Sequence, residues 1–452
     1  MLKKWSVGLV SVVVAASLAG CGGTSTDSGS SATTAPATSD APKADAGKAV
    51  TLKVIHWKNE AANKWFDKFN KKFEEKYPNI KIDYTTVPSD DTFKQLQQTR
   101  IQANDVDVIT NLSALVGAPA DWSKGAADPT WKQWIDAGLI ADLSDQPFIK
   151  NYSPEAIKDG GTYNGKVYGI TTGSVAFTGL FYNKQIFSDN GLKIPTTWDE
   201  FVAVCEALKA KGVAPIGFAG KDIWPVNLAV QGLQASIHKD QLSYIKGLWE
   251  GTNKFNDAES LDVLTKAQKM LGYAADGFMG VDYGSLPGLF AQGKVAMIAD
   301  GTWDAPTIAA ANPNLQFGYF PIPGSNDAVQ NKSLAGKYDM TFMVAEKSKN
   351  KDAALQYLAF FSEPANYAEY VNEVGFLPVQ PNVDLKSSFI KELTPYMEGF
   401  KLGWDQLFIN RNNAGEHVAG SSVHAEFLAP AGPLKTPQEL ADLSQKEWDA
   451  AQ

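Results

Sequence analysis

Several tryptophan residues have acidic or amide neighbours and are therefore candidates for ligand recognition. Each candidate group combines an indole with a carboxylate or amide: Trp303 with Asp304, Trp404 with Asp405, and Trp224 with Asp222 and Asn227. An indole offers a flat apolar face, and carboxylates and amides form hydrogen bonds with hydroxyl groups. The combination suits reversible binding of a ligand that has both apolar faces and hydroxyls, such as a sugar.

A second set of candidates lies at the ends of predicted strands. Alternating or continuous apolar runs predict strands at 50–57, 80–87 and 106–110, and helical periodicity predicts helices at about 62–76 and from Phe93. This order indicates a parallel sheet of the α/β class, in which ligands bind beyond the carboxyl ends of the strands. The polar candidates there are Asn59, Glu60, Asn111 and Ser113, with Asp339 just before a predicted strand at 340–345. Each could instead lie in a solvated loop or cap a helix, as Asn59 could, and Trp57 could be a ligand platform or part of the core.

Further α/β units follow after the first domain has closed. Residues 165–187 contain two strand-like runs, and 295–299 predict another strand. Thr197 and Glu200 form a capping box that begins a helix, and Cys205 falls on the inner face of that helix. We therefore expect two lobes with several chain crossovers and a Cys205 that belongs to the core.

The N-terminus has the pattern of a secretory signal. Lys3 and Lys4 precede an apolar run that is too short to span a bilayer, which takes about 20 residues. Leu18-Ala19-Gly20-Cys21 resembles the bacterial lipobox, which implies cleavage before Cys21 and its lipidation. Residues 22–48 are rich in Ser, Thr, Ala and Gly and predict a flexible tether. The predicted division is a signal peptide at 1–20 and a lipidated cysteine with its tether at 21–49.

Composition excludes several classes of function. The formal net charge of the 452 residues is −9, and loss of Lys3 and Lys4 with the signal makes the chain more acidic. An acidic chain argues against nucleic acid and against electrostatic attachment to anionic lipid. Cys205 would be the sole cysteine beside a lipidated Cys21, which leaves no internal disulfide and no cysteine metal site. His417 and His424 are seven apart, but we expect neither a metal nor a cofactor.

Four motifs, in their order and spacing, resemble the extracellular solute-binding proteins of carbohydrate ABC transporters, whose members include the maltodextrin-binding protein. The motifs are LFYNKQIF, IPTTWDEF, FAQGKVAMIADGTWD and VGFLPV. The resemblance spans nearly the whole chain from Val50. It implies a type II periplasmic-binding-protein-like fold with two α/β lobes and three hinge crossings, a carbohydrate in the cleft, and a permease partner with an ATPase subunit.

Carried over to this sequence, the resemblance implies an N-lobe of 51–169 and 324–376 and a C-lobe of 171–322 and 378–452. It places Trp303 where the family often stacks a sugar ring. The maltodextrin binder has an aromatic residue near the place of Asn111 and an acid near that of Ala176, and this sequence has neither. A long α-glucan is therefore disfavoured. We expect a monomer that is anchored by lipid to the outer face of the cell membrane.

Two other functions remain open at this stage. A surface carbohydrate-active enzyme would need two carboxylates about 5–9.5 Å apart, and no motif marks such a pair among the 50 acidic residues. A binding protein for a non-sugar such as a polyamine, or a partner of a sensor kinase, would need acids and rings around a cation. No G-x-x-x-x-G-K-[ST] motif occurs, so ATP hydrolysis would belong to another subunit.

Overall fold

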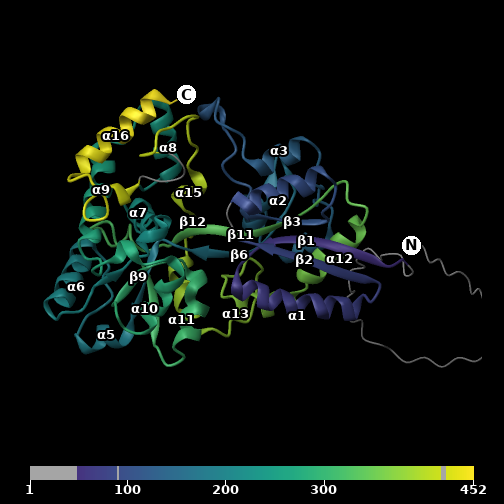
Figure 1. Ribbon diagram of the computed structural model, residues 1–452, viewed down its shortest axis with the longest axis horizontal. Coiled ribbons are helices and arrows are strands. Elements are labelled where there is room, and N and C mark those ends of the chain that lie inside the picture. Colours follow the sequence, from purple (N-terminus) through teal and green to yellow (C-terminus); the bar gives the residue numbers. More distant parts are fainter. Residues whose placement is uncertain (1–47, 89–90, 419–423, 452) are drawn as a thin grey trace, which may run out of the picture. The chain divides into compact units, whose positions relative to one another are not determined.

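The computed structural model describes residues 48–88, 91–418 and 424–451 (Figure 1). The predicted signal peptide, Cys21 and all but the last two residues of the predicted tether lie outside the described residues. Among the helices of the described part, none is long and apolar enough to cross a membrane.

The first lobe is built on a sheet that holds six strands among the described residues, with β12-β11-β3-β1-β2 in order and β6 paired with β11. Its strands are β1 (Val50–Trp57), β2 (Ile80–Val87), β3 (Val108–Ser113), β6 (Ile170–Ala176), β11 (Ala335–Val344) and β12 (Lys401–Leu402). β1 pairs in parallel with both β2 and β3, which confirms the predicted parallel arrangement. β11 runs antiparallel to β3 and β6.

Helices cover both faces of this sheet. They are α1 (Glu60–Lys76), α2 (Asp91–Gln102), α3 (Thr130–Asp136), α4 (Pro154–Ala156), α12 (Lys351–Phe361) and α13 (Pro364–Val374). Figure 1 shows α1 and α13 on one side of the sheet and α2 and α3 on the other. The four-residue spacing of Trp65, Phe69 and Phe73 puts these rings on the buried face of α1, where Trp65 packs edge-on against Tyr370 of α13.

The second lobe is built on a smaller sheet, with β10-β7-β9-β8 in order. Its strands are β7 (Gly179–Asn183), β8 (Ile216–Gly217), β9 (Met297–Ala299) and β10 (Phe317–Pro321). The helices with it are α5 (Lys184–Asp189), α6 (Trp198–Ala210), α7 (Trp224–Ile237), α8 (Gln241–Glu250), α9 (Ala258–Leu271), α10 (Leu286–Ala291), α11 (Ala305–Ala311), α14 (Ser388–Met397), α15 (Trp404–Leu407) and α16 (Pro437–Ala450). The predicted capping box of Thr197 and Glu200 begins α6, and Cys205 is fully buried on that helix, so both predictions are confirmed.

The chain passes between the two sheets at separate places. It leaves the first sheet between β6 and β7, returns between β10 and β11, and leaves again between α13 and α14. It touches the first sheet once more at β12, which lies between α14 and α15 in the sequence and pairs with β11. β6 pairs with β11 along its whole length, with Ile170 opposite Phe342 at one end and Ala176 opposite Gly336 at the other. The chain therefore stays in the first sheet up to Ala176. The two-lobed α/β fold class is confirmed, while the residue-level lobe boundaries stay a prediction.

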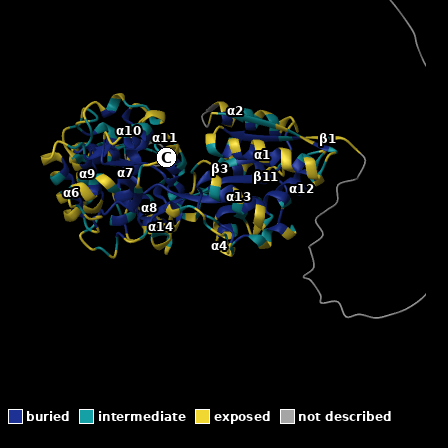
Figure 2. Ribbon diagram, turned by 90° about the horizontal axis from the view of Figure 1, so that it is seen from below, coloured by how far each residue is buried: buried dark blue, intermediate teal, exposed yellow. Residues whose placement is uncertain are grey.

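Each lobe encloses its own apolar interior. Buried residues fill the sheets and the inner faces of the helices in Figure 2, and exposed residues lie on the outer helix faces. A hairpin of β4 (Thr162–Tyr163) and β5 (Lys166–Val167) adds to the first lobe.

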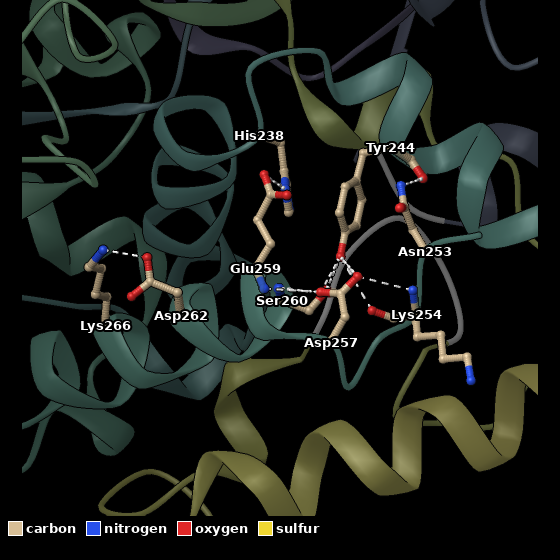
Figure 3. A network of polar contacts seen from close by, with 9 residues as sticks. All are labelled: His238, Tyr244, Asn253, Lys254, Asp257, Glu259, Ser260, Asp262 and Lys266. Atoms are coloured by element: carbon tan, nitrogen blue, oxygen red, sulfur yellow. Dashed lines mark hydrogen bonds and ion pairs between the residues drawn. The ribbon is translucent and has the colours of Figure 1, made fainter. Parts of the chain in front are cut away.

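A polar network joins three helices of the second lobe (Figure 3). Tyr244 of α8 donates a hydrogen bond to Asp257, at 2.7 Å, and Asp257 caps the N-terminus of α9. His238, which follows α7, lies 3.0 Å from Glu259 of α9 through Nδ1 and stacks on the Tyr244 ring at 4.0 Å between centroids. Trp404 packs on the same His238, at 5.3 Å, which seals this tryptophan inside the lobe.

Candidate binding site

A cavity of about 760 Å³ is lined by residues of both lobes. Six aromatic side chains contribute to its wall: Trp57, Phe177, Trp224, Tyr283, Trp303 and Phe427. Charged side chains stand among these rings: Lys58, Asp222, Lys337, Asp339, Asp405, Glu416 and Glu426. We call this the first cavity. Its volume is within the roughly 300–1,000 Å³ that is typical of small-molecule sites.

Trp303 is held in place at the wall of the first cavity. It lies in a single 3₁₀ turn, Thr302–Asp304, which follows β9. Its indole N–H donates a hydrogen bond to the hydroxyl oxygen of Tyr283 at 2.5 Å, and Trp224 lies 4.6 Å from the Tyr283 ring and 6.4 Å from Trp303 between centroids. The three rings form a continuous aromatic wall on the second-lobe side.

Asp304 is buried and does not line the first cavity, contrary to the prediction that it binds ligand. The 3₁₀ turn runs directly into α11, and the Asp304 carboxylate accepts a hydrogen bond from Tyr283, at 2.5 Å, beneath the aromatic wall. Asp300 lies beside it, with no exposed surface. Burial, and then the proximity of Asp304, raises the pKa of Asp300 well above its ordinary value. Asp304 therefore supports Tyr283 and Trp303 from behind.

Trp224 stands at the start of α7 and is 44% exposed, which suits a surface that a ligand covers. Ile223 before it adopts φ +65° and ψ −60°, a backbone conformation that is costly for a β-branched residue. Asp222 lines the same cavity and accepts a hydrogen bond from the backbone N–H of Tyr283 at 2.6 Å.

Asn227 also lines the first cavity, but its amide already has protein partners. It donates to Glu426 at 3.0 Å and accepts from the N–H of Ala425 at 3.2 Å. Glu426 in turn contacts His424 through Nδ1 at 2.7 Å. Asn227 thus fastens the segment that begins at residue 424 to the edge of the cavity.

On the first-lobe side, Trp57 and Asn59 line the first cavity at the carboxyl end of β1. His56 lies beneath Trp57, stacked at 4.6 Å between ring centroids and 15° between planes. Asn59 caps α1 by accepting a hydrogen bond from the N–H of Ala62 at 2.9 Å. Helix capping is the alternative to ligand binding that the sequence offers for Asn59. Asp339 lines the cavity as well, and its carboxylate forms an ion pair with Lys337 at 3.0 Å.

Glu60, like Asp304, is a predicted candidate that borders neither this cavity nor the next one. It lies in the first turn of α1 and pairs with Lys64, one turn further, at 2.7 Å. Its side chain is 79% exposed, and its carboxylate interacts favourably with the helix N-terminus. Glu60 is therefore a helix-end residue rather than a lining residue.

Asn111 and Ser113 line a second cavity of about 750 Å³. The sequence predicted that both follow a strand, but β3 extends to Ser113 because it pairs with β11, Asn111 with Thr341 and Ser113 with Asp339. The second cavity lies at the end of β3 and beside α2 and α3, and many of its polar side chains are amides: Gln95, Gln97, Gln98, Asn111, Gln133 and Gln406.

Trp404 lines neither cavity, so its predicted role in binding is wrong. It is 1% exposed and stacks on Phe408 inside the second lobe, at 5.6 Å between centroids. Its neighbour Asp405 instead lines both cavities. The two Trp-Asp pairs are therefore oriented oppositely. In Trp303-Asp304 the indole borders a cavity, whereas in Trp404-Asp405 the aspartate does.

Comparison with protein families identifies the chain. The model of the bacterial extracellular solute-binding proteins matches residues 57–368, which is more than half of the chain. The chain belongs to this family.

Individual relatives agree with this assignment. An uncharacterized ABC transporter extracellular-binding protein of Pyrococcus horikoshii is 30% identical over 342 residues, 73% of each chain. A multiple sugar-binding protein of Streptococcus mutans is 26% identical over 342 residues, 72% of this chain and 74% of that protein. The solved structure of the solute-binding protein RafE in complex with raffinose shares the fold, with a TM-score of 0.73 at 21% identity, over 88% of this chain and 99% of that one.

Several lining residues of this solute-binding protein were not predicted, among them Phe177, Tyr283, Lys337 and Phe427. Phe177 follows β6 at the crossing between the lobes, and Tyr283 lies in a short 3₁₀ turn without a distinctive motif. Nothing in the local sequence separates these rings from core rings, because each reaches the cavity through the packing of distant elements.

The histidines near the C-terminus pair with acids. His417 Nδ1 lies 2.7 Å from Glu447, and His424 Nδ1 lies 2.7 Å from Glu426. Over residues 48–88, 91–418 and 424–451, no group of three or more His, Cys, Asp or Glu side chains has the arrangement of a metal site.

Proposed function

We propose that this chain is the substrate-binding subunit of a sugar ABC importer and that it binds a mono- or oligosaccharide in the first cavity. The observation that carries the proposal is the wall of Trp224, Tyr283 and Trp303, which faces a cavity that also holds acids and lysines. Flat rings cover the apolar C–H faces of a sugar, and charged groups form the stronger hydrogen bonds with its hydroxyls. The sugar-binding names of relatives support the same ligand class.

Calorimetry with a panel of mono- and oligosaccharides tests this proposal. We expect at least one sugar to bind, and we expect Trp303→Ala to raise its Kd by about 30-fold, or roughly 2 kcal/mol, as for a central aromatic contact. Absence of heat with every sugar, together with binding of spermidine, would favour a polyamine-binding protein instead.

The bound sugar would contact both lobes, because the first cavity is lined by Trp57 and Lys337 of the first lobe and by Trp224 and Trp303 of the second. A ligand that contacts both lobes only when they approach each other shifts the population toward a closed form. The closed form would then dock, as a monomer, on a permease that is driven by a separate ATPase subunit. Small-angle scattering should show a smaller radius of gyration with sugar than without it.

We further propose that the sugar is released unchanged and that the chain is not an enzyme. Incubation of the protein with its tightest oligosaccharide ligand should generate no new reducing ends. Release of such ends in proportion to protein concentration would favour the carbohydrate-active enzyme.

Membrane attachment would come from lipidation of Cys21, since two acyl chains on one residue give stable anchoring. In a bacterial host, Cys21→Ser should move the protein from the membrane fraction to the medium. Cys205→Ala is the matched control, because Cys205 is buried in the fold and its loss should leave the protein in the membrane fraction. Equal retention of the Cys21→Ser protein on membranes would contradict the anchor.

A further inference from the structure

The two cavities described above meet at one residue. Among the described residues, only Asp405 lines both the cavity of about 760 Å³ and the one of about 750 Å³. It is the second residue of the short helix α15, and its backbone N–H donates to the side-chain oxygen of Gln231 at 3.2 Å. This hydrogen bond holds the backbone of Asp405 in place at the junction of the two cavities.

The Asp405 carboxylate has unused hydrogen-bonding capacity. Its Oδ1 atom is buried and has no hydrogen-bond partner in the protein. A buried acceptor without a partner is costly, and a ligand hydroxyl at this junction would supply the missing donor. Burial raises the pKa of Asp405 above its ordinary value, while the Gln406 side chain and Lys337 lower it.

The two cavities differ in chemistry. Both have aromatic side chains, which are Trp131 and Trp134 in the second, but the first has many charged groups. The second is rich in amides, with Lys94 and Asp405 as its charged side chains among the described residues. Gln406 is 8% exposed, lines the second cavity, and its Oε1 is also buried without a partner. Amides both donate and accept, so they match hydroxyl groups without selecting for ligand charge.

We propose that the second cavity is a second sugar subsite and that Asp405 is the residue that couples it to the first. One end of an oligosaccharide packs on the Trp224 and Trp303 wall, the chain passes Asp405, and the next ring is hydrogen-bonded by Gln406 and Asn111. A hydroxyl near the junction donates to Asp405. The assignment rests on the proposed sugar-binding function. It implies that this protein discriminates between sugars by their length.

A length series tests the assignment on the unaltered chain. Calorimetry with galactose, melibiose, raffinose and stachyose, and with xylose through xylotetraose, should show affinity that rises at least about tenfold from the mono- to the trisaccharide in one series, the gain expected from added hydrogen bonds. This measurement needs no variant and therefore no assumption about folding.

Variants then show which residues cause the gain in affinity with sugar length. Gln406→Ala should remove most of the preference for the longer sugar, because Gln406 lines the second cavity and not the first. Asp405→Asn should weaken the trisaccharide by about 30-fold, as loss of a charged acceptor does. Trp224→Ala is the matched control in the first cavity and should weaken sugars of every length.

The outcomes are distinguishable. If sugars bind but a monosaccharide binds as tightly as a trisaccharide and Gln406→Ala changes nothing, the second subsite is disproved and the sugar-binding function stands. If length increases affinity and Trp224→Ala alone matters, the second subsite is equally disproved. If no saccharide binds at all, the proposed function itself fails, and this inference fails with it.

Discussion

The indole nitrogen of Trp303 lies 2.5 Å from the hydroxyl oxygen of Tyr283, and that hydroxyl in turn donates to Asp304 at 2.5 Å. The chain of two hydrogen bonds connects a cavity-facing ring to a buried carboxylate. It fixes the plane of the Trp303 ring, which a stacking contact requires.

Tyr283→Phe should therefore weaken sugar binding although the ring itself remains. We expect the Kd to rise about tenfold, or roughly 1.4 kcal/mol, because Trp303 loses its acceptor and Asp304 its donor. Tyr273→Phe is a matched control, since it removes a hydrogen bond between a phenol and Glu206 away from both cavities. Calorimetry on the two variants checks the effect, and an equal change in both would contradict a role in positioning Trp303.

Asp300→Asn should stabilise the protein at neutral pH. The pKa of Asp300 is raised in the folded state by burial and by Asp304, so above about pH 4 the folded chain binds a proton that the unfolded chain releases. Wild-type stability consequently falls as pH rises from that point, and the variant lacks this loss. Chemical denaturation at pH 4 and pH 7.5 measures the difference between the two proteins, which should grow with pH.

An exposed acid provides the control for this prediction. Asp276→Asn removes a carboxylate from the surface of the same lobe and should show no comparable gain between the two pH values. A gain for Asp300→Asn that is the same at both pH values would mean that Asp300 does not hold its proton in the fold.

His56 should make the protein less stable in mild acid. Burial lowers its pKa to about 4, so between about pH 6.5 and pH 4 the unfolded chain takes up a proton that the folded chain refuses. The free energy of unfolding should fall across this range by an amount on the order of 3 kcal/mol from this group.

The variant His56→Asn isolates that contribution, because an amide can retain the contact that Nδ1 makes with the Trp57 carbonyl oxygen. Denaturation between pH 7 and pH 4 should give a shallower loss of stability for the variant than for the wild type. Parallel curves for the two proteins would show that His56 does not contribute.

Ile223→Gly should stabilise the fold and weaken binding. The backbone at φ +65° and ψ −60° is strained for isoleucine and free for glycine, so we expect a gain of about 1 kcal/mol after the larger entropy of unfolded glycine is subtracted. The Ile223 side chain is 46% exposed and lines the first cavity, so its removal should raise the Kd. Ile223→Val keeps the branched side chain and the strain, and thermal denaturation should rank the glycine variant above it.

Local patterns predicted the elements well. The alternation in Val50–Trp57, the aromatic spacing in α1 and the capping box of α6 all involve residues within a turn or a strand of each other. The order of strands and helices then limited the fold to an α/β arrangement, because parallel neighbours need helical crossovers.

The candidate site was predicted only in part. Eight predicted residues line the first cavity: Trp57, Asn59, Asp222, Trp224, Asn227, Trp303, Asp339 and Asp405. Asn111 and Ser113 line the second cavity instead, because β3 is extended by its pairing with β11, more than two hundred residues away in the sequence. Pairing over that separation leaves no trace in the local pattern of either strand.

The sequence by itself determined where the strands and helices form and which residue types could recognise a hydroxylated ligand, since both follow from periodicity and side-chain chemistry. Only the tertiary structure decided which member of each Trp-Asp pair faces the cavities. Trp303 borders the first cavity because Tyr283 and Asp304 hold it from behind, whereas Trp404 is buried by His238 and Phe408 and leaves Asp405 at the junction. The orientation of an identical dipeptide depends on the elements packed against it, and those come from distant parts of the chain.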